Sequence, residues 1–214
     1  MKKQQLICLA FFLCFVSVLA AAQSEFPKVE LSGDYSYVSL HPQIISSQNA
    51  NGGGGAFVYN FSSIFGIKAD FQGYAAGTGI STYLRNKYGY AGAASGNGFT
   101  YLFGPQIKKH SGKFQPFGEA LFGAIHTNGY ATLIKCIENN GCSGISGNGN
   151  NNGFAMEFGG GLDIPISSHV QIRPVEVDYL YTHIGANHLA NYSAGWNNFK
   201  YVAGVNFTLG SGSQ

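Results

Sequence analysis

Eight segments of this chain alternate between apolar and polar side chains, and this alternation limits the possible folds more than any other feature. A period of two places successive residues on opposite faces of a β-strand. In FQPFGEALFGAI, for example, Phe114, Phe122 and Ala124 share one face, whereas Gln115 and Glu119 share the other. Beyond the first two dozen residues, no convincing helical periodicity competes with this pattern. The segments are VELSGDYSYV, GAFVYNF, GIKADFQGY, FTYLFGPQI, FQPFGEALFGAI, FAMEFGGGLDI, QIRPVEVDYLY and FKYVAGVNFTL.

The links between these segments alternate in length. Segments two and three, four and five, and six and seven are joined by the short links SSIF, KKHSGK and PISSH. The other four links are long and rich in Gly, Asn and Ser. Short turns at one end and long loops at the other are typical of a membrane β-barrel. The sequence therefore predicts an all-β fold, an eight-stranded antiparallel up-and-down transmembrane β-barrel with short periplasmic turns and long outer loops.

Composition decides which face of the strands points outward. Charged residues make up 10% of the chain, against about 25% in typical soluble domains. The apolar set is also too large and aromatic to fill an eight-stranded barrel, whose interior just admits side chains. We therefore expect the apolar face to contact lipid and the polar face to line the lumen. The alternative is a soluble, lipocalin-like carrier with the two faces exchanged.

Most of the acidic residues fall on the face assigned to the lumen. There, Lys68 and Lys200 are the clear basic partners, and Arg173 joins them if Pro174 marks a β-bulge, a common place for a strand proline. We expect that bulge, because buried charges are usually paired. Acids remain in excess even then. The predicted lumen-facing charged residues are Glu30, Asp34, Lys68, Asp70, Glu119, Glu157, Asp163, Glu176, Asp178 and Lys200.

The first 22 residues have the features of a secretory signal peptide. A basic start at Lys2 and Lys3 precedes an apolar block and three alanines, and the block is too short for a transmembrane helix. We therefore expect residues 1–22 to be removed and residues 23–214 to form the barrel domain. Without Lys2 and Lys3, ten basic residues face ten acidic ones, so no nucleic-acid partner is expected.

Two cysteines remain after the signal peptide, in KCIENNGCSG. Cys136 and Cys142 flank an Asn-Gly turn in a chain that we expect to be exported, so they predict a loop disulfide. A metal-binding role is disfavoured, because no His or second Cys pair lies nearby in the sequence.

At this point the chain resembles a known family, the small outer-membrane β-barrel proteins of the OmpA/OmpX type. The stretches that carry the resemblance are GIKADFQGY, YLFGPQIKKHSGKFQPFGEALFGA, FGGGLDIPISSHVQIRPVEVDYLYTHIG and NNFKYVAGVNFTLG. The last strand, with Gly204, Phe207 and Leu209, resembles the signal that the barrel assembly machinery recognises, although GSGSQ follows it. The resemblance implies partners in outer-membrane lipid and that machinery, and roles in envelope integrity, adhesion or weak transport. No C-terminal peptidoglycan-binding domain is expected.

The leading functional prediction is a non-enzymatic envelope or surface protein that meets an unknown extracellular partner through its loops, without a cofactor. A narrow cation-favouring pore is one alternative, although eight strands leave little interior space. A lipid A-modifying enzyme is another. The deacylase family carries a His-x-Ser-Asn-Ala-like stretch, and here Gly185 follows His183 where the serine should stand. That departure argues against a hydrolase.

Four histidines fall near the long-loop end, where imidazoles could gather around a metal ion. They come from separate loops without closely spaced pairs, so the sequence predicts no metal site. These residues are His41, His126, His183 and His188.

Overall fold

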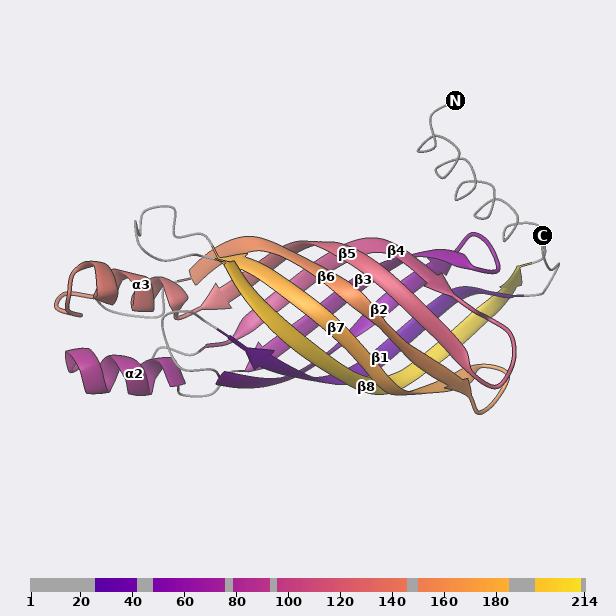
Figure 1. Ribbon diagram of the computed structural model, residues 1–214, viewed down its shortest axis with the longest axis horizontal. Helices are drawn as coiled ribbons and strands as arrows, with labels where there is room; N and C mark the ends of the chain where they lie inside the picture. Colours follow the sequence, from indigo (N-terminus) through magenta and orange to yellow (C-terminus); the bar gives the residue numbers. More distant parts are fainter. Residues whose placement is uncertain are drawn as a thin grey trace, which may run out of the picture.

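The structure is a computed structural model in which eight strands form a closed barrel. Each strand pairs antiparallel with its neighbours in the chain, and β8 closes the barrel on β1 (Figure 1). This arrangement confirms the predicted up-and-down meander. The described residues are 26–41, 48–75, 79–92, 96–145, 150–184 and 195–212. The strands are β1 (Phe26–Leu40), β2 (Gln48–Asn60), β3 (Phe65–Ala75), β4 (Gly98–Lys108), β5 (Gln115–Asn128), β6 (Asn150–Pro165), β7 (Val170–Ile184) and β8 (Gly195–Gly212).

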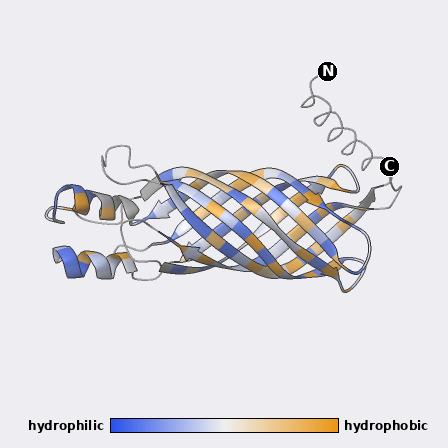
Figure 2. Ribbon diagram, viewed as in Figure 1, coloured by the Kyte–Doolittle hydropathy of each residue, from blue (hydrophilic) through white to orange (hydrophobic). Residues whose placement is uncertain are grey.

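The two faces of the strands are oriented as the composition predicts. On β4, Leu102 is fully buried whereas its neighbour Phe103 is 51% exposed. Hydrophilic and hydrophobic residues alternate along the strands of the barrel wall (Figure 2). Large apolar side chains such as Phe57, Phe71 and Phe207 are exposed on the outside. An apolar outer wall suits contact with lipid and is the reverse of the lipocalin-like arrangement.

The short links form tight turns at one end of the barrel. In the β2–β3 turn, Ser62 Oγ accepts a hydrogen bond of 2.9 Å from the backbone N–H of Phe65. In the β6–β7 turn, Ser167 Oγ accepts one of 3.1 Å from the N–H of Val170. A serine hydroxyl that caps nearby backbone donors is a common turn-forming device. The turns therefore follow from local sequence.

A bulge interrupts the pairing of β7 with β8 between Arg173 and Glu176. It lies at Pro174, as the sequence analysis expects, because proline cannot donate to the ladder. The bulge changes the alternation of β7, so that Arg173 and Glu176 both become buried, at 4% and 1% exposure. This irregularity adds a basic side chain to the interior.

Two helices, α2 (Gly79–Tyr88) and α3 (Tyr130–Glu138), lie at the long-loop end of the barrel (Figure 1). The sequence analysis found no convincing helical periodicity beyond the first two dozen residues, and it therefore missed both helices. Both helices are short, at 10 and 9 residues, and such helices gain most of their stability from tertiary packing, which their sequence does not reveal. Among the described residues, no helix is long and apolar enough to cross a membrane.

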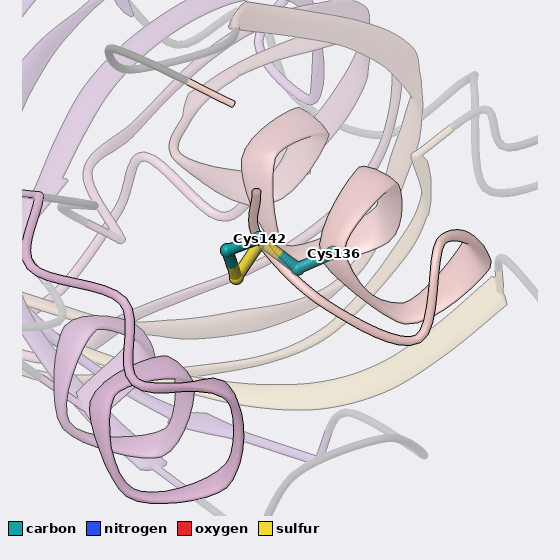
Figure 3. The surroundings of a disulfide bond; sticks show 2 residues. All are labelled: Cys136 and Cys142. Carbon is teal, nitrogen blue, oxygen red and sulfur yellow. A yellow bond between two sulfur atoms is a disulfide. The ribbon is translucent and has the colours of Figure 1, made fainter. Parts of the chain in front are cut away.

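A disulfide between Cys136 and Cys142 closes the C-terminal end of α3 (Figure 3). Cys136 is fully buried, and Gly141 N–H donates a 2.9 Å hydrogen bond to the Cys136 carbonyl. The disulfide therefore links the segment after α3 to the helix itself. We call two segments the cap: residues 79–92, which contain α2, and residues 129–145, which contain α3.

Candidate functional site

The half of the lumen nearest the cap is an apolar core. Leu102, Leu121 and Leu180 point inward from β4, β5 and β7 and are 0–2% exposed. Trp196 packs in the same cluster. A cavity of about 30 Å³ among the surrounding side chains has room for about one or two water molecules. This part of the interior is therefore closed by packed side chains.

The apolar core continues out of the barrel into the cap. Ile80 and Leu84 of α2 are fully buried, and so are Leu133 and Cys136 of α3. These residues belong to the same contiguous cluster as the inward-facing leucines. The cap is consequently packed onto the barrel mouth by shared core residues.

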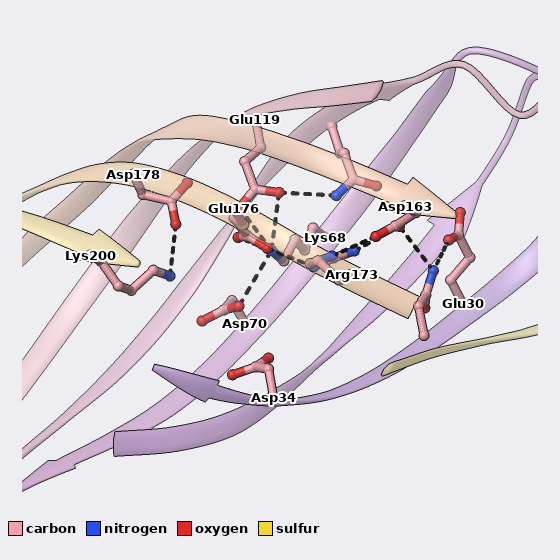
Figure 4. Close-up of polar contacts among 12 residues, drawn as sticks. Glu30, Asp34, Lys68, Asp70, Glu119, Asp163, Arg173, Glu176, Asp178 and Lys200 are labelled. Carbon is pink, nitrogen blue, oxygen red and sulfur yellow. Dashed lines mark hydrogen bonds and ion pairs between the residues drawn. The ribbon is translucent and has the colours of Figure 1, made fainter. Parts of the chain in front are cut away.

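The half of the lumen nearest the short turns is filled by charged side chains, which Figure 4 shows as a row along the barrel. At its turn end, Lys108 Nζ lies 2.5 Å from Glu30 Oε2 and 2.7 Å from Asp163 Oδ2. His110 Nε2 lies 2.9 Å from Glu30 Oε1, and its Nδ1 lies 2.8 Å from the carbonyl oxygen of Ser63. Both ring nitrogens of His110 therefore lie within hydrogen-bond distance of an oxygen.

The middle of the row is held by Arg173 and Lys68. Arg173 makes a bidentate contact with Asp163, through Nε at 2.8 Å and Nη2 at 3.0 Å, and its Nη1 donates to Glu176 at 2.7 Å. Lys68 Nζ donates to Glu119 at 2.8 and 3.0 Å and lies 3.3 Å from Glu176. Charge-assisted and bidentate bonds of this kind are the strong ones inside proteins.

The last group of the row lies next to the apolar core. Lys200 Nζ lies 2.7 Å from Glu157 Oε1 and 3.3 Å from Asp178 Oδ2, and all three side chains are fully buried. Glu157 Oε2 and Asp178 Oδ1 have no hydrogen-bond partner. Carboxylate oxygens buried without a partner are costly, so this group is the least satisfied part of the interior.

All ten charged residues predicted to face the lumen lie inside the barrel in the structure. Nine of them are fully buried, whereas Asp34 is half-buried and accepts a 2.8 Å hydrogen bond from Gln72. The sequence analysis did not assign Lys108 or His110 to the lumen, because it placed both in the short link after the fourth segment. The signal was available for Lys108, which continues the inward parity of Gln106.

The described interior carries more acid than base. Its buried charged side chains comprise the seven carboxylates Glu30, Asp70, Glu119, Glu157, Asp163, Glu176 and Asp178 and the four basic groups Lys68, Lys108, Arg173 and Lys200. The formal charges of these eleven groups sum to −3, and the half-buried Asp34 adds one more acid to the interior.

The histidines of the long-loop end do not converge in the described structure. His183 is exposed at the end of β7, and His126 Nδ1 lies 2.6 Å from Asn152 Oδ1. Among the described residues, the group whose geometry could hold a metal ion consists of carboxylates and contains neither His41, His126 nor His183. His188 and Gly185 lie outside the described residues.

Gly159 lines the interior beside the least satisfied carboxylate, and only a glycine fits there. A Cβ atom at this position would meet the Val177 carbonyl oxygen and Asp178 Oδ1, and would lie 2.6 Å from the Asp178 Cα. Backbone atoms cannot move aside as a flexible side chain does, so the added methyl group overpacks the interior.

We therefore expect Gly159→Ala to lower the free energy of unfolding by about 1–3 kcal/mol. Urea unfolding of the refolded barrel, followed by the fluorescence of its single tryptophan, measures the change. Gly33→Ala is the matched control, because a Cβ at Gly33 meets nothing within 4 Å. Equal stability of both variants would contradict the close packing at Gly159.

Comparison with known proteins agrees with this architecture. A family model described as the outer membrane protein β-barrel domain matches residues 6–212. The chain belongs to this family. Membership in the outer membrane protein β-barrel family places the chain in the outer membrane. No curated protein matches its sequence significantly.

Several solved outer membrane barrels are similar to this chain. Neisserial surface protein A is 9% identical with a TM-score of 0.57, and the match covers 87% of this chain and 99% of that one. Ail of Yersinia pestis is 11% identical with a TM-score of 0.48, covering 87% and 99%. OprG from Pseudomonas aeruginosa is 14% identical with a TM-score of 0.43, covering 91% and 100%. At such identities, the likeness to the neisserial protein shows a shared fold and no more.

Proposed function

We propose that this chain is a non-enzymatic outer membrane protein, exported by its N-terminal signal peptide, that holds a folded cap outside the cell for contact with an external partner. The observation that carries the proposal is the apolar core shared by the barrel mouth and the cap. Long loops of outer membrane barrels face the exterior, so the cap is an external structure. Core packing and the Cys136–Cys142 bond fix its shape, and a preorganised surface loses less conformational entropy on binding.

The charge of the cap favours an acidic partner. Its charged residues are the basic Arg85, Lys87 and Lys135 and the acidic Glu138, all exposed. Tyr83 lies beside this surface, and its hydroxyl accepts a 3.0 Å hydrogen bond from Lys87. Basic and aromatic side chains together suit an anionic surface polymer such as a sulfated or carboxylated polysaccharide.

The interior disfavours the two alternatives. A narrow pore needs a continuous water-filled path through the lumen. Here packed leucines close one half of the lumen, and ion pairs fill the other half. A lipid-modifying hydrolase needs a nucleophile within hydrogen-bond reach of its base. The side chain of His183 is exposed at the end of β7, and Gly185 follows it in the sequence where the deacylase stretch has serine.

Binding of cells to immobilised heparin tests the proposal. Cells that display the barrel should be retained, and Arg85→Gln, Lys87→Gln and Lys135→Gln together should reduce retention several-fold. The contacts are exposed and electrostatic, so the difference should shrink as the salt concentration rises.

Lys109→Gln with Lys113→Gln is the matched control, because both lysines are exposed at the short-turn end, which faces the periplasm in this proposal. A band shift on boiling of the outer membrane fraction checks that each variant is folded. If the control variant lost retention as strongly as the cap variant, or if displayed wild-type barrel gave none, the assignment of the cap as an anion-binding surface would be wrong.

A further inference from the structure

Four carboxylates converge in the middle of the lumen. Glu119, Glu157, Glu176 and Asp178 come from β5, β6 and β7, and each offers one oxygen so that these oxygens all lie within 4.8 Å of one another. All four side chains are buried. We call these four residues the carboxylate cluster. Like charges this close repel strongly in a low-dielectric interior unless a positive group or a proton lies among them.

The neighbouring lysines compensate only part of this charge. Lys68 pairs with Glu119 and Glu176, and Lys200 pairs with Glu157 and Asp178. Four carboxylates and two lysines leave a net charge of −2; Arg173, which also donates to Glu176, is shared with Asp163, and Asp70 adds a further acid beside Lys68. A single divalent cation would offset two of these uncompensated negative charges.

A second observation points to a ligand at the same place. Glu157 Oε2 and Asp178 Oδ1 have no hydrogen-bond partner although both side chains are 0% exposed, and Asp178 Oδ2 makes no hydrogen bond either despite its proximity to Lys200. At the other end of the row, Glu30 is bound by Lys108, His110 and Asn60. Among the residues that the structure describes, the buried side-chain oxygens without a hydrogen-bond partner belong to the carboxylate cluster, the adjacent Asp70 and Asn128 at the loop end of β5.

We propose that the carboxylate cluster binds one hard divalent cation of the size of Ca²⁺ inside the barrel. All donor atoms are carboxylate oxygens, which hard cations prefer over thiolate or imidazole. Calcium–oxygen distances of about 2.3–2.6 Å put opposite ligands about 4.6–5.2 Å apart, so oxygens that all lie within 4.8 Å of one another can surround one such ion. Mg²⁺ demands near-ideal octahedral geometry and usually keeps several water ligands, so a buried site made of carboxylates suits it less well than Ca²⁺.

The paired carboxylates can still serve as ligands. An ionised carboxylate has about four lone-pair sites, so an oxygen of Glu119 or Glu176 that accepts from Lys68 can also contact an ion. Because the cluster lies next to the apolar core, a bound ion should exchange slowly with ions in the solvent. We therefore expect the ion to be bound during folding. The ion would join β5, β6 and β7 through ligands from all three strands.

Calcium retained after refolding tests this proposal. The chain is refolded into a zwitterionic detergent free of lipopolysaccharide, either with CaCl₂ or with EDTA, and free ion is removed by gel filtration before bound calcium is measured by mass spectrometry. Wild type refolded with CaCl₂ should retain about one Ca²⁺ per chain and should unfold at a higher temperature than wild type refolded with EDTA. The same concentration of MgCl₂ should give a smaller shift.

The variant Glu157→Gln with Asp178→Asn removes two ligand charges with little change in volume. It should retain no calcium, and its unfolding temperature should be the same with CaCl₂ and EDTA. Asp34→Asn is the matched control, because it removes an inward-facing charge outside the carboxylate cluster, and it should retain calcium like wild type. If the double variant does not fold, single Glu157→Gln and the wild-type comparison of CaCl₂ with EDTA still decide the question. Folded wild type without calcium and without a temperature shift would overturn the proposal, as would a double variant that retains as much calcium as wild type.

Discussion

Replacing Lys68 with methionine should destabilise the barrel by about 3–5 kcal/mol, the usual cost of removing one partner from a buried ion pair. Lys68 Nζ lies within 3.5 Å of oxygens of Asp70, Glu119 and Glu176. After the substitution, Glu176 still accepts a hydrogen bond from Arg173. Glu119 still accepts one from the uncharged side chain of Gln106. Two or more buried carboxylates then lack a counter-charge. No ion pair offsets the free-energy cost of removing these carboxylates from water. Urea unfolding in EDTA, which excludes compensation by an added cation, measures the loss.

Lys87→Met is the control for this prediction, because it makes the same chemical change on the exposed face of α2. Exposed substitutions usually change stability by no more than about 0.5 kcal/mol. A Lys68→Met variant as stable as Lys87→Met would show that the neighbouring carboxylates are neutral or hydrated in the folded barrel. The row of ion pairs would then contribute little to stability.

Leu102→Ala should lower the free energy of unfolding by about 2–5 kcal/mol, the range for a leucine removed from a packed core. Leu102 is fully buried among the leucines that close the lumen below the cap. The loss has two parts, the transfer of the side chain and the cavity that remains, and the closed wall of the barrel limits collapse around that cavity. Thermal or urea unfolding in detergent or vesicles, with tryptophan fluorescence as the signal, measures it.

Ile67→Ala provides the comparison on the outer wall, where Ile67 is 55% exposed. Lipid or detergent chains fill the space that this substitution leaves, so only the transfer part is lost and the effect should be the smaller of the two. If Ile67→Ala were the more damaging substitution, the loop-end half of the lumen would have to be loosely packed or water-filled. The same result would weaken the case that shared core packing holds the cap.

Much of this architecture could be predicted from the sequence because a barrel wall has a period of two. Once Phe103 is assigned to lipid, the parity of β4 sends Leu102 and Gln106 inward without knowledge of any other strand. The bulge at Pro174 was predictable for a similar reason, since proline removes a ladder donor. Both inferences depend only on neighbours in the sequence.

The remaining features depend on contacts between distant segments. Parity could have placed Lys108 inward, but its partners Glu30 and Asp163 come from β1 and β6, and the sequence does not show that the three side chains meet. The helices of the cap are stabilised by Leu84 and Leu133 packing onto the core of the barrel, and local propensity carries little of that information. The carboxylate cluster is likewise formed by three strands, and parity alone does not show which inward acids meet.

The pairing of β1 with β8 joins Phe26 to Gly212 and thereby ties the two ends of the described chain into one ladder. A partly made or truncated chain that lacks β8 leaves β1 and β7 with open edges, and in lipid such edges have no water to satisfy them. The barrel cannot therefore be completed strand by strand as it is synthesised. It has to be kept unfolded until its last strand is available, because only the complete set of eight strands forms a wall without open edges.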